Sequence, residues 1–146
     1  MNYQEQKYTV SFIFNSNYSK VLLVHKLSPE WQKGRVNGVG GKYEQGETAA
    51  QCVARETEEE TALVIPEKEW VYIGTIEQPQ GDVGILAAQY AGPESDAKQS
   101  AHETIEWFPV DELPANCMKN LPFLIPLALL KLREDYFETF TITYTN

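Results

Sequence analysis

The chain has few cysteines. Its 146 residues include two, Cys52 and Cys117, which is too few for the disulfide framework that stabilises small secreted domains. Cys52 falls on the apolar side of a helical pattern, where a thiol packs as a small core residue. These features favour a reduced compartment, and we expect the protein to be cytoplasmic.

Long apolar runs are also missing. The N-terminal sequence MNYQEQKYTV contains no stretch typical of a signal peptide. No segment reaches the roughly 18 uninterrupted apolar residues that a membrane-spanning helix requires. We therefore expect neither a membrane span nor a membrane partner.

Positive charge is scarce as well. The chain contains 12 lysines and arginines against 21 aspartates and glutamates, for a net charge of −9. Nucleic acids and membrane surfaces are themselves anionic, so this balance argues against binding to a nucleic-acid polymer. A small anionic ligand remains compatible with it, provided that a cation mediates the contact.

What the sequence does contain fits a single globular domain over residues 1–146, in which 42% of the residues are hydrophobic. β-Rich runs at 8–14 and 20–26 flank a turn-like cluster and predict a hairpin. Further strands are expected at 70–77, 83–90, 104–109 and 139–144, and helices from about 47 to 61 and within 123–132. Pro126 should occupy the first turn of the second helix. This order predicts an α+β domain with helices packed on a mixed sheet.

The first expected helix carries an acidic stripe. At about 100° per residue, the positions that share one face at core-facing spacing are Ala49, Cys52, Val53, Glu56, Glu59, Glu60 and Leu63. The three carboxylates repel one another and are costly to bury unpaired. A solvated charge run would explain Glu58, which lies on the other side of the helix. It would not explain why Glu56, Glu59 and Glu60 fall on the core-facing side. A hard divalent cation such as Mg²⁺ or Mn²⁺ would offset the repulsion and leave room for a phosphate.

A polar loop is expected from Ser28 to Gly46, before this helix. Its glycines allow close approach by a ligand, although the plainer interpretation is that they turn the chain into the helix. The loop is not a P-loop, because Tyr43 follows Lys42 where Ser or Thr should stand, and it is not a dinucleotide fingerprint. The pattern of an EF-hand is absent. Beside the acidic stripe, the loop indicates a site that takes phosphate and metal together.

The charged positions of this region follow one spacing, Gly41-x5-Glu47-x7-Arg55-Glu56-x2-Glu59-Glu60-x2-Leu63. It resembles the Nudix box, G-x5-E-x7-R-E-U-x-E-E-x-G-U, in which U is a bulky aliphatic residue. The stretches NGVGGK and EWFPVDELP are similar to MutT-type members, so the resemblance covers most of the chain. It implies the Nudix fold, an α/β/α sandwich with a mixed β-sheet between helices. It also implies a hydrolase that uses Mg²⁺ or Mn²⁺ to direct water onto a nucleoside diphosphate linked to another group.

Two positions depart from the box. Thr57 stands for the aliphatic residue and Ala62 for the glycine. Thr57 lies about 100° from Glu56 around the helix, so we expect it to affect packing rather than metal binding. Ala62 in a left-handed cap conformation would cost on the order of 1 kcal/mol, so we expect the helix to run one residue longer.

The resemblance implies a metal site made by Glu56, Glu59 and Glu60 with the Gly40 backbone. One of these glutamates would also take the proton of the attacking water. The fixed guanidinium fork of Arg55 should pair with a helix carboxylate and orient it.

Two further acids have expected catalytic roles. Glu47, at the helix start, suits a contact with the helix N-terminus and a tie to Arg55. Glu103 falls where related enzymes often have an accessory acid, although a surface glutamate explains it equally well.

The resemblance also implies substrate-binding residues. Gly40, Gly41 and Lys42 would contact phosphate, and Asn37 and Asn120 match asparagines that read a base in related enzymes. An amide donates and accepts together, as discrimination of a purine edge requires. Asparagine is also common in turns and caps, so a purely structural role stays open for both. Two further side chains could stack on a base or cover it, Trp31 and Met118.

The leading hypothesis is a MutT-like pyrophosphohydrolase that converts a purine dNTP, including an oxidised one such as 8-oxo-dGTP, to dNMP and pyrophosphate. An ADP-ribose or ADP-sugar pyrophosphatase is the alternative among enzymes. The alternative of another class is a non-catalytic Nudix-like sensor that only binds a nucleotide, against which the complete acid set argues. The expected partner is a small-molecule nucleotide, and the expected assembly is a monomer or a homodimer.

Overall fold

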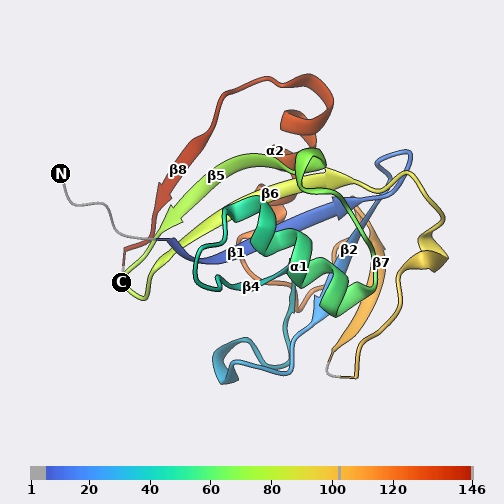
Figure 1. Ribbon diagram of the computed structural model, residues 1–146, viewed down its shortest axis with the longest axis horizontal. Coiled ribbons are helices and arrows are strands. Elements are labelled where there is room, and N and C mark those ends of the chain that lie inside the picture. Colours follow the sequence, from blue (N-terminus) through green and yellow to red (C-terminus); the bar gives the residue numbers. More distant parts are fainter. Residues whose placement is uncertain (1–5, 102, 146) are drawn as a thin grey trace.

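The computed structural model describes residues 6–101 and 103–145. Its strands and helices in this range are β1 (Gln6–Phe14), β2 (Lys20–His25), β3 (Val36–Asn37), β4 (Val39–Lys42), α1 (Ala49–Thr61), β5 (Val71–Glu77), β6 (Asp82–Gln89), β7 (Thr104–Pro109), α2 (Leu121–Glu134) and β8 (Phe140–Thr143). Short 3₁₀ turns lie in the connections, η1 (Glu30–Gln32), η2 (Glu67–Glu69) and η3 (Glu94–Asp96). Figure 1 shows the long strands crossing the molecule behind α1. The expected α+β class and the hairpin of β1 and β2 are confirmed.

All of these strands belong to one mixed sheet. Its path runs β3-β2-β1-β6-β5-β8, with β4 paired to β1 and β7 paired to β2. The β1–β6 and β5–β8 pairs are parallel, and the other pairs are antiparallel. Strand β1 has two antiparallel partners along its length, because residues 8–11 pair with β4 while Ile13 and Phe14 pair with β2. This arrangement lays the glycine run of β4 against the first half of β1.

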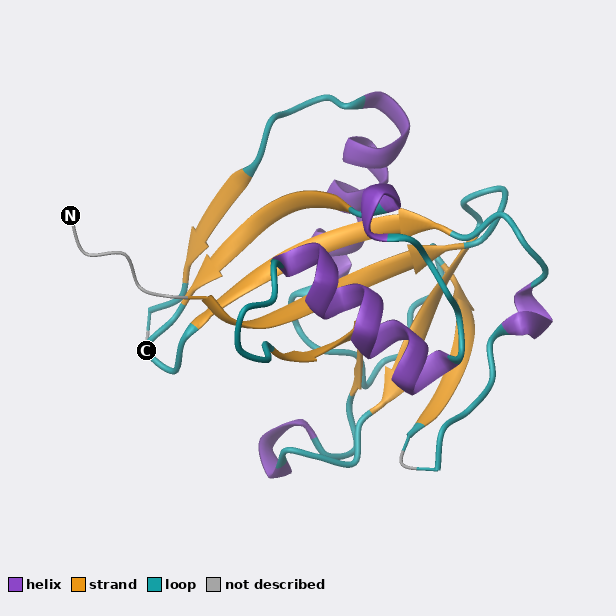
Figure 2. Cartoon of the chain, viewed as in Figure 1, coloured by secondary structure: helices purple, strands orange, loops and turns teal. Residues whose placement is uncertain are grey.

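The sheet separates two cores. On β1, Phe12 and Phe14 join the core under α2, while Ile13 joins the core under α1. Strand β6 divides in the same way, with Ile85 on the α2 side and Leu86 on the α1 side. Strands covered on both faces have nearly continuous apolar sequences, which explains the runs at the start of the chain. Figure 2 shows α1 in front of the sheet and α2 behind it, which confirms the α/β/α sandwich.

The loop expected from Ser28 to Gly46 is wrong in part, because it contains β3 and β4. Gly40 and Gly41 pair with Val10 and Thr9 across the β1–β4 ladder. A Cβ on Gly40 would lie 2.1 Å from the Thr9 carbonyl oxygen, so only glycine lets the two strands approach this closely. Glycine has low strand propensity, so a propensity pattern does not predict β4. The strand forms because its backbone lies close enough to β1 to pair with it.

Helix α1 begins with a capping box. The Gln51 amide donates to the Thr48 hydroxyl at 3.2 Å, and the Thr48 amide donates to the Gln51 side-chain oxygen at 2.9 Å. The expected extension of the helix past Thr61 is wrong, because Ala62 takes the left-handed conformation with φ of 66°. This turn directs Leu63 into the core, where it is 1% exposed. Its burial offsets the steric cost of about 1 kcal/mol at Ala62.

Helix α2 begins at Leu121, so Pro122 and not Pro126 lies in the first turn. The expected place of Pro126 is therefore wrong: it lies inside the helix, where it cannot donate a hydrogen bond to the carbonyl one turn earlier. Pro126 faces solvent, while Leu121, Leu124 and Ile125 are fully buried. Their apolar burial outweighs the missing hydrogen bond. Within the described residues, no helix has the length and apolar character needed to span a membrane.

Candidate active site

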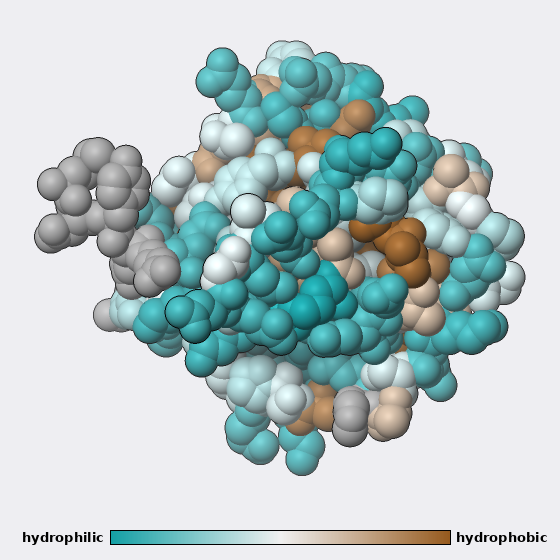
Figure 3. Space-filling model, viewed as in Figure 1, coloured by the Kyte–Doolittle hydropathy of each residue, from teal (hydrophilic) through white to brown (hydrophobic). Residues whose placement is uncertain are grey.

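Helix α1 buries a narrower face than its sequence predicts. Its fully buried side chains are Cys52, Val53, Thr57 and Thr61. The last three are spaced four apart and set the centre of the buried face, and Thr57 acts in packing as expected. Glu56 and Glu60 lie on one side of this centre and are half-buried, whereas the Glu59 side chain is 58% exposed. The expectation of three inward carboxylates is therefore wrong for Glu59, and the outer face of α1 is largely hydrophilic (Figure 3).

Glu56 packs directly on the backbone of β4. A Cβ built on Gly41 would lie 2.6 Å from a Glu56 carboxylate oxygen, so any larger residue at this position would displace the carboxylate. Burial raises the pKa of Glu56, and the adjacent Arg55 guanidinium opposes that rise. Glycine at position 41 therefore allows the Glu56 carboxylate to lie against the glycine strand.

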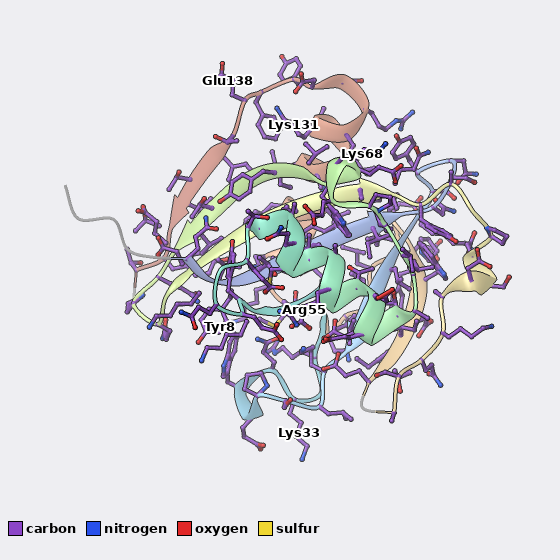
Figure 4. All side chains as sticks on the ribbon, viewed as in Figure 1. Tyr8, Lys33, Arg55, Lys68, Lys131 and Glu138 are labelled. Carbon is purple, nitrogen blue, oxygen red and sulfur yellow. The ribbon has the colours of Figure 1, made fainter. Side chains whose placement is uncertain are left out.

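Arg55 joins the carboxylates around it. Its Nε and Nη2 donate to the two oxygens of Glu47 at 2.7 and 2.9 Å. Its Nη1 donates to Glu56 at 3.0 Å and to Glu59 at 3.4 Å, and Nη2 also donates to the Lys42 carbonyl at 3.1 Å. A planar guanidinium suits such two-pronged contacts, and its hydrogen bonds lower the pKa of Glu47. The contacts expected between Arg55, Glu47 and a helix carboxylate are present, and Figure 4 marks Arg55 on α1.

Glu60 is strongly perturbed by its surroundings. Burial raises its pKa to about 8, and the negative charge of Glu103 adds to the rise. The Lys26 ammonium and a hydrogen bond from the Gly40 backbone act in the opposite direction. The Oε2 atom of Glu60 is buried and has no hydrogen-bond partner. A carboxylate oxygen in this state is available to a cation or to a proton.

Glu103 pairs with a lysine. The Lys26 Nζ atom lies 3.2 Å from Glu103 Oε1, and the two side chains are 13% and 12% exposed. Antiparallel pairing of His25 with Thr104 across β2 and β7 places the two residues side by side. The second oxygen of Glu103 is buried without a partner. The negative charge of Glu103 acts on Glu60, and its one described ion pair is with Lys26. The expected role of Glu103 as an accessory acid stays a prediction.

Some of these groups line a cavity of about 820 Å³, a volume within the usual range of small-molecule sites. The expected site residues that line it are Asn37, Gly40, Gly41, Lys42, Glu56, Glu60 and Asn120. The other expected catalytic residues, which lie outside the lining, are Glu47, Arg55, Glu59 and Glu103. Trp31 and Met118 also line the cavity. The structure thus gathers the loop, the helix and Asn120, separated in sequence, around one space.

The residues of this site fit a hard cation, although not as the expected trio. Among the described residues, no three His, Cys, Asp or Glu side chains form a ready-made metal site, because Glu59 turns toward Arg55 and solvent. Glu56 and Glu60 line the same cavity, burial disfavours both charges, and one Glu60 oxygen lacks a partner. Carboxylate oxygens of this kind suit Mg²⁺ or Mn²⁺, which retain several water ligands.

The two asparagines differ in how their amides are engaged. Asn37 Nδ2 donates to the Gln32 side-chain oxygen at 3.1 Å, and its Oδ1 accepts from the Gly38 amide at 2.8 Å. Asn120 occupies the N-cap position of α2 without a side-chain cap. Its Nδ2 donates to the Tyr144 hydroxyl at 2.7 Å, and its Oδ1 is buried without a partner. Asn120 therefore has a carbonyl acceptor to offer a ligand.

Several cavity residues were not indicated by the sequence. Lys26 follows β2, Tyr144 follows β8, and Gln78 and Gln80 come from the β5–β6 connection. They meet because β2 pairs with β1 and β8 pairs with β5. The alternation of the last strand predicted one buried face that includes Tyr144, but no local pattern pointed to Lys26.

A family model described as NUDIX domain matches residues 6–125. Among curated proteins, the NAD-capped RNA hydrolase NudC of Stutzerimonas stutzeri (strain A1501) is 33% identical over 88 residues, which cover 60% of this chain and 32% of that protein. The chain spans about a third of the length of the curated relatives it matches.

Solved structures agree in fold. An ADP-ribose pyrophosphatase from Streptococcus suis 89-1591 has a TM-score of 0.66 at 19% identity, over 92% of this chain and 96% of that chain. A MutT protein from Bacillus halodurans has a TM-score of 0.64 at 22% identity, over 96% of this chain and 90% of that chain. Identities this low establish the fold alone. Because the family model matches most of the sequence, the chain belongs to the Nudix hydrolase family.

Proposed function

We propose that this protein hydrolyses a phosphoric anhydride bond of a purine nucleotide, with a purine nucleoside triphosphate as substrate and the monophosphate and pyrophosphate as products. One observation carries the proposal: Glu56, Glu60 and Asn120 line the same cavity. Two carboxylates suited to a cation and an amide suited to a base are the two kinds of group that a nucleotide hydrolase needs.

Glu56 and Glu60 would hold a divalent cation, together with the Gly40 backbone, which lines the same cavity. When bound, Mg²⁺ or Mn²⁺ neutralises phosphate charge and lowers the pKa of a coordinated water. The pairing of acidic residues with a cation also explains how a chain with a net charge of −9 accepts an anionic substrate.

The chain's own groups orient the reacting parts. Arg55 holds Glu56 at 3.0 Å, and Gly41 leaves the space that this carboxylate occupies. Glu56 and Glu60 are the acids that line the cavity, so one of them accepts the proton of the attacking water. Lys42 lines the same cavity and contacts a phosphate oxygen.

The base is recognised by a polar group in a partly apolar wall. Asn120 Oδ1 accepts a hydrogen bond from the base, while Leu124, Met118 and Val83 line the cavity around it. Because Nδ2 is occupied by Tyr144, the amide presents its acceptor to the ligand. This arrangement favours a base edge that carries an N–H donor, as in guanine, its oxidised forms and the amino group of adenine.

A substrate of the ADP-ribose or dinucleotide type is the second candidate. The names of the related proteins, an NAD-capped RNA hydrolase and an ADP-ribose pyrophosphatase, favour it. So does Trp31, which lines the cavity and yet is 66% exposed. An exposed indole at a cavity offers a flat surface to a second base. Both candidates use the same bond chemistry and differ in the group beyond the second phosphate.

A substrate panel tests the proposal. Purine and pyrimidine dNTPs, 8-oxo-dGTP, ADP-ribose and NADH are incubated with the protein and Mg²⁺, and the products are separated by chromatography. The proposal expects dNMP and pyrophosphate from a purine dNTP, whereas the second candidate expects AMP from ADP-ribose or NADH. Nucleotide binding without any product would identify a non-catalytic sensor and would overturn both.

A further inference from the structure

The cavity contains a sheltered lysine besides its acids. Lys26 lines the cavity, and its side chain is 13% exposed. Glu103 pairs with it at 3.2 Å but is not part of the lining, so Lys26 is the member of this ion pair that borders the cavity. This arrangement offers the cation of the pair, and not its carboxylate, to a bound ligand.

Lys26 shares the lining of the cavity with both of its acids, Glu56 and Glu60. Its charge favours the ionised forms of both. A phosphate that enters the cavity approaches these two carboxylates, and like charges at short range repel. Lys26 compensates from a sheltered position, whereas Lys42, also in the lining, is exposed to solvent and more strongly screened.

Lys26 also has donors to spare. An ammonium group carries three N–H donors, and the described structure gives this one a single acceptor, Glu103. The backbone of Lys26 is fixed by hydrogen bonds with Arg35 at 2.8 Å and with Gly34 at 3.0 Å, at the base of the arm formed by residues 26–35. Glu103 thus orients the side chain and leaves N–H groups for a ligand oxygen.

We propose that Lys26 binds a phosphate oxygen of the substrate and that Glu103 is a positioning residue that holds the ammonium group in place. The inference rests on the proposed function, because it requires a phosphate-bearing ligand in this cavity. It gives Glu103 a role that differs from that of an accessory catalytic acid, since Glu103 acts through Lys26 and does not touch the substrate.

Titration calorimetry with inorganic pyrophosphate in Mg²⁺ buffer tests the contact without turnover. Lys26→Met keeps an extended side chain and removes its charge. The matched control is Lys33→Met, because Lys33 is exposed on the projecting arm and lies outside the lining (Figure 4). We expect the pyrophosphate Kd to rise about 10- to 150-fold in Lys26→Met, as for a lost hydrogen bond to a charged group. In Lys33→Met it should change about twofold or less, and a change this small in Lys26→Met would overturn the proposal.

A double variant separates phosphate binding from simple neutralisation of Glu103. If Lys26 only neutralised Glu103, adding Glu103→Gln to Lys26→Met would restore pyrophosphate binding, and this result would overturn the proposal. If Lys26 binds phosphate, the double variant stays as weak as Lys26→Met, and Glu103→Gln alone causes a smaller loss. Should Lys26→Met fail to fold, the double variant replaces it, because it leaves no unpaired buried charge. Its pyrophosphate Kd is then compared with that of Glu103→Gln, and we expect it to be about 10-fold higher or more.

The failures of the two proposals can be told apart. If the wild-type protein hydrolyses no nucleotide but Lys26→Met weakens pyrophosphate binding, the proposed function is wrong and the phosphate contact holds. If a purine nucleotide is hydrolysed but pyrophosphate binding does not depend on Lys26, the proposed function holds and the role of Lys26 is wrong.

Discussion

At the scale of residues, the site is marked by buried oxygens that lack partners. Glu60 Oε2, Glu103 Oε2 and Asn120 Oδ1 are all buried without a described hydrogen-bond partner. A buried acceptor in this state destabilises a protein by about 1–3 kcal/mol, so a group of them next to a cavity is expected where a ligand or ion completes the contacts. Glu60 and Asn120 line that cavity, and Glu103 is paired with Lys26, which also lines it.

Glu60 and Glu58 should differ in effect although they stand in one acidic run. Glu60→Gln removes a charge that faces the cavity and should lower kcat by about 10²-fold or more, as found for metal ligands and electrostatic groups. Glu58→Gln alters an exposed side chain and should change kcat by about twofold or less. Steady-state kinetics on the preferred nucleotide measure both. Equal losses of kcat in the two variants would show that the burial of these side chains does not determine their effect on catalysis.

Asn120→Ala should act on base selectivity. The kcat/KM for the preferred purine nucleotide should fall about 5- to 150-fold, because a polar group of the base loses its partner. Tyr144→Phe, which frees Asn120 Nδ2, should cost less on the same substrate, about 2- to 12-fold. A poor pyrimidine substrate and the Mg²⁺ affinity serve as controls and should barely change. A uniform loss on every substrate would make Asn120 a structural residue of α2.

At the scale of elements, the site is a contact between α1 and β4. The glycines of β4 let this strand lie close to β1, and they leave the Glu56 carboxylate room against its backbone. The capping box starts α1 at Ala49, which sets the phase of every acid that follows. Arg55 then ties the helix to the end of β4 through the Lys42 carbonyl. Helix phase and strand proximity together position the two cavity-lining carboxylates.

Ala62→Gly should stabilise the protein. Ala62 ends α1 with φ of 66°, and glycine takes this conformation without the clash of a Cβ. The free energy of unfolding should rise by up to about 1 kcal/mol and the melting temperature by about 2–4 °C. Ala54→Gly in the interior of the same helix is the control and should lower stability by about 1 kcal/mol or more. A melting temperature that falls in Ala62→Gly would contradict the strain at this cap.

At the scale of the whole molecule, two helices cover a sheet, and the half-buried acids Glu56 and Glu60 line a cavity beside it. The chain as a whole has a net charge of −9. The acids of the site and the overall charge both make the metal-free protein sensitive to pH and to divalent cations. The free energy of unfolding should therefore change together with the protonation of the site and with its binding of a divalent cation.

The metal-free protein should lose stability as pH rises. Burial raises the pKa of Glu60 from 4.5 to about 8. Between these values the folded protein keeps a proton that the unfolded chain has released, so the contribution is full below pH 4.5 and is lost as pH rises through about 8. In EDTA, the melting temperature should fall between about pH 4.5 and 8, and Glu60→Gln should remove this part of the decline. An identical pH profile in the variant would show that Glu60 is not the group responsible.

Added Mg²⁺ should reverse that decline. A ligand that binds the folded state raises the melting temperature, and the rise should be larger at about pH 9 than at pH 6, because protons compete for Glu60 at the lower pH. Scanning fluorimetry at matched ionic strength measures the shift, with Na⁺ as the control. Nucleotide hydrolysis should likewise vanish in EDTA and return with Mg²⁺ or Mn²⁺. Full activity in rigorously metal-free buffer would rule out the proposed mechanism.

The class of fold and the family spacing of the site follow from local patterns in the amino-acid sequence. Apolar runs predict β1, β2, β5 and β6 because strands covered on both faces need them. The spacing from Gly41 to Leu63 predicts the helix and its acids, since all of these features are local in the chain. The same local view placed Glu59 inward, extended α1 past Thr61 and made a loop of β4, because it does not include the packing that decides each of these points.

Which of the charged and polar groups meet depends on the packing of the complete sheet. Lys26 and Glu103 are 77 residues apart and meet because β2 pairs with β7. The amide of Asn120 meets the Tyr144 hydroxyl because β8 pairs with β5 and brings Tyr144 close to the start of α2. Strand pairing between distant segments depends on the burial of whole faces, and a local pattern of residues does not specify it. The physical reason is that periodicity sets which side of an element is buried, whereas the partners on that side are set by the packing of the complete sheet.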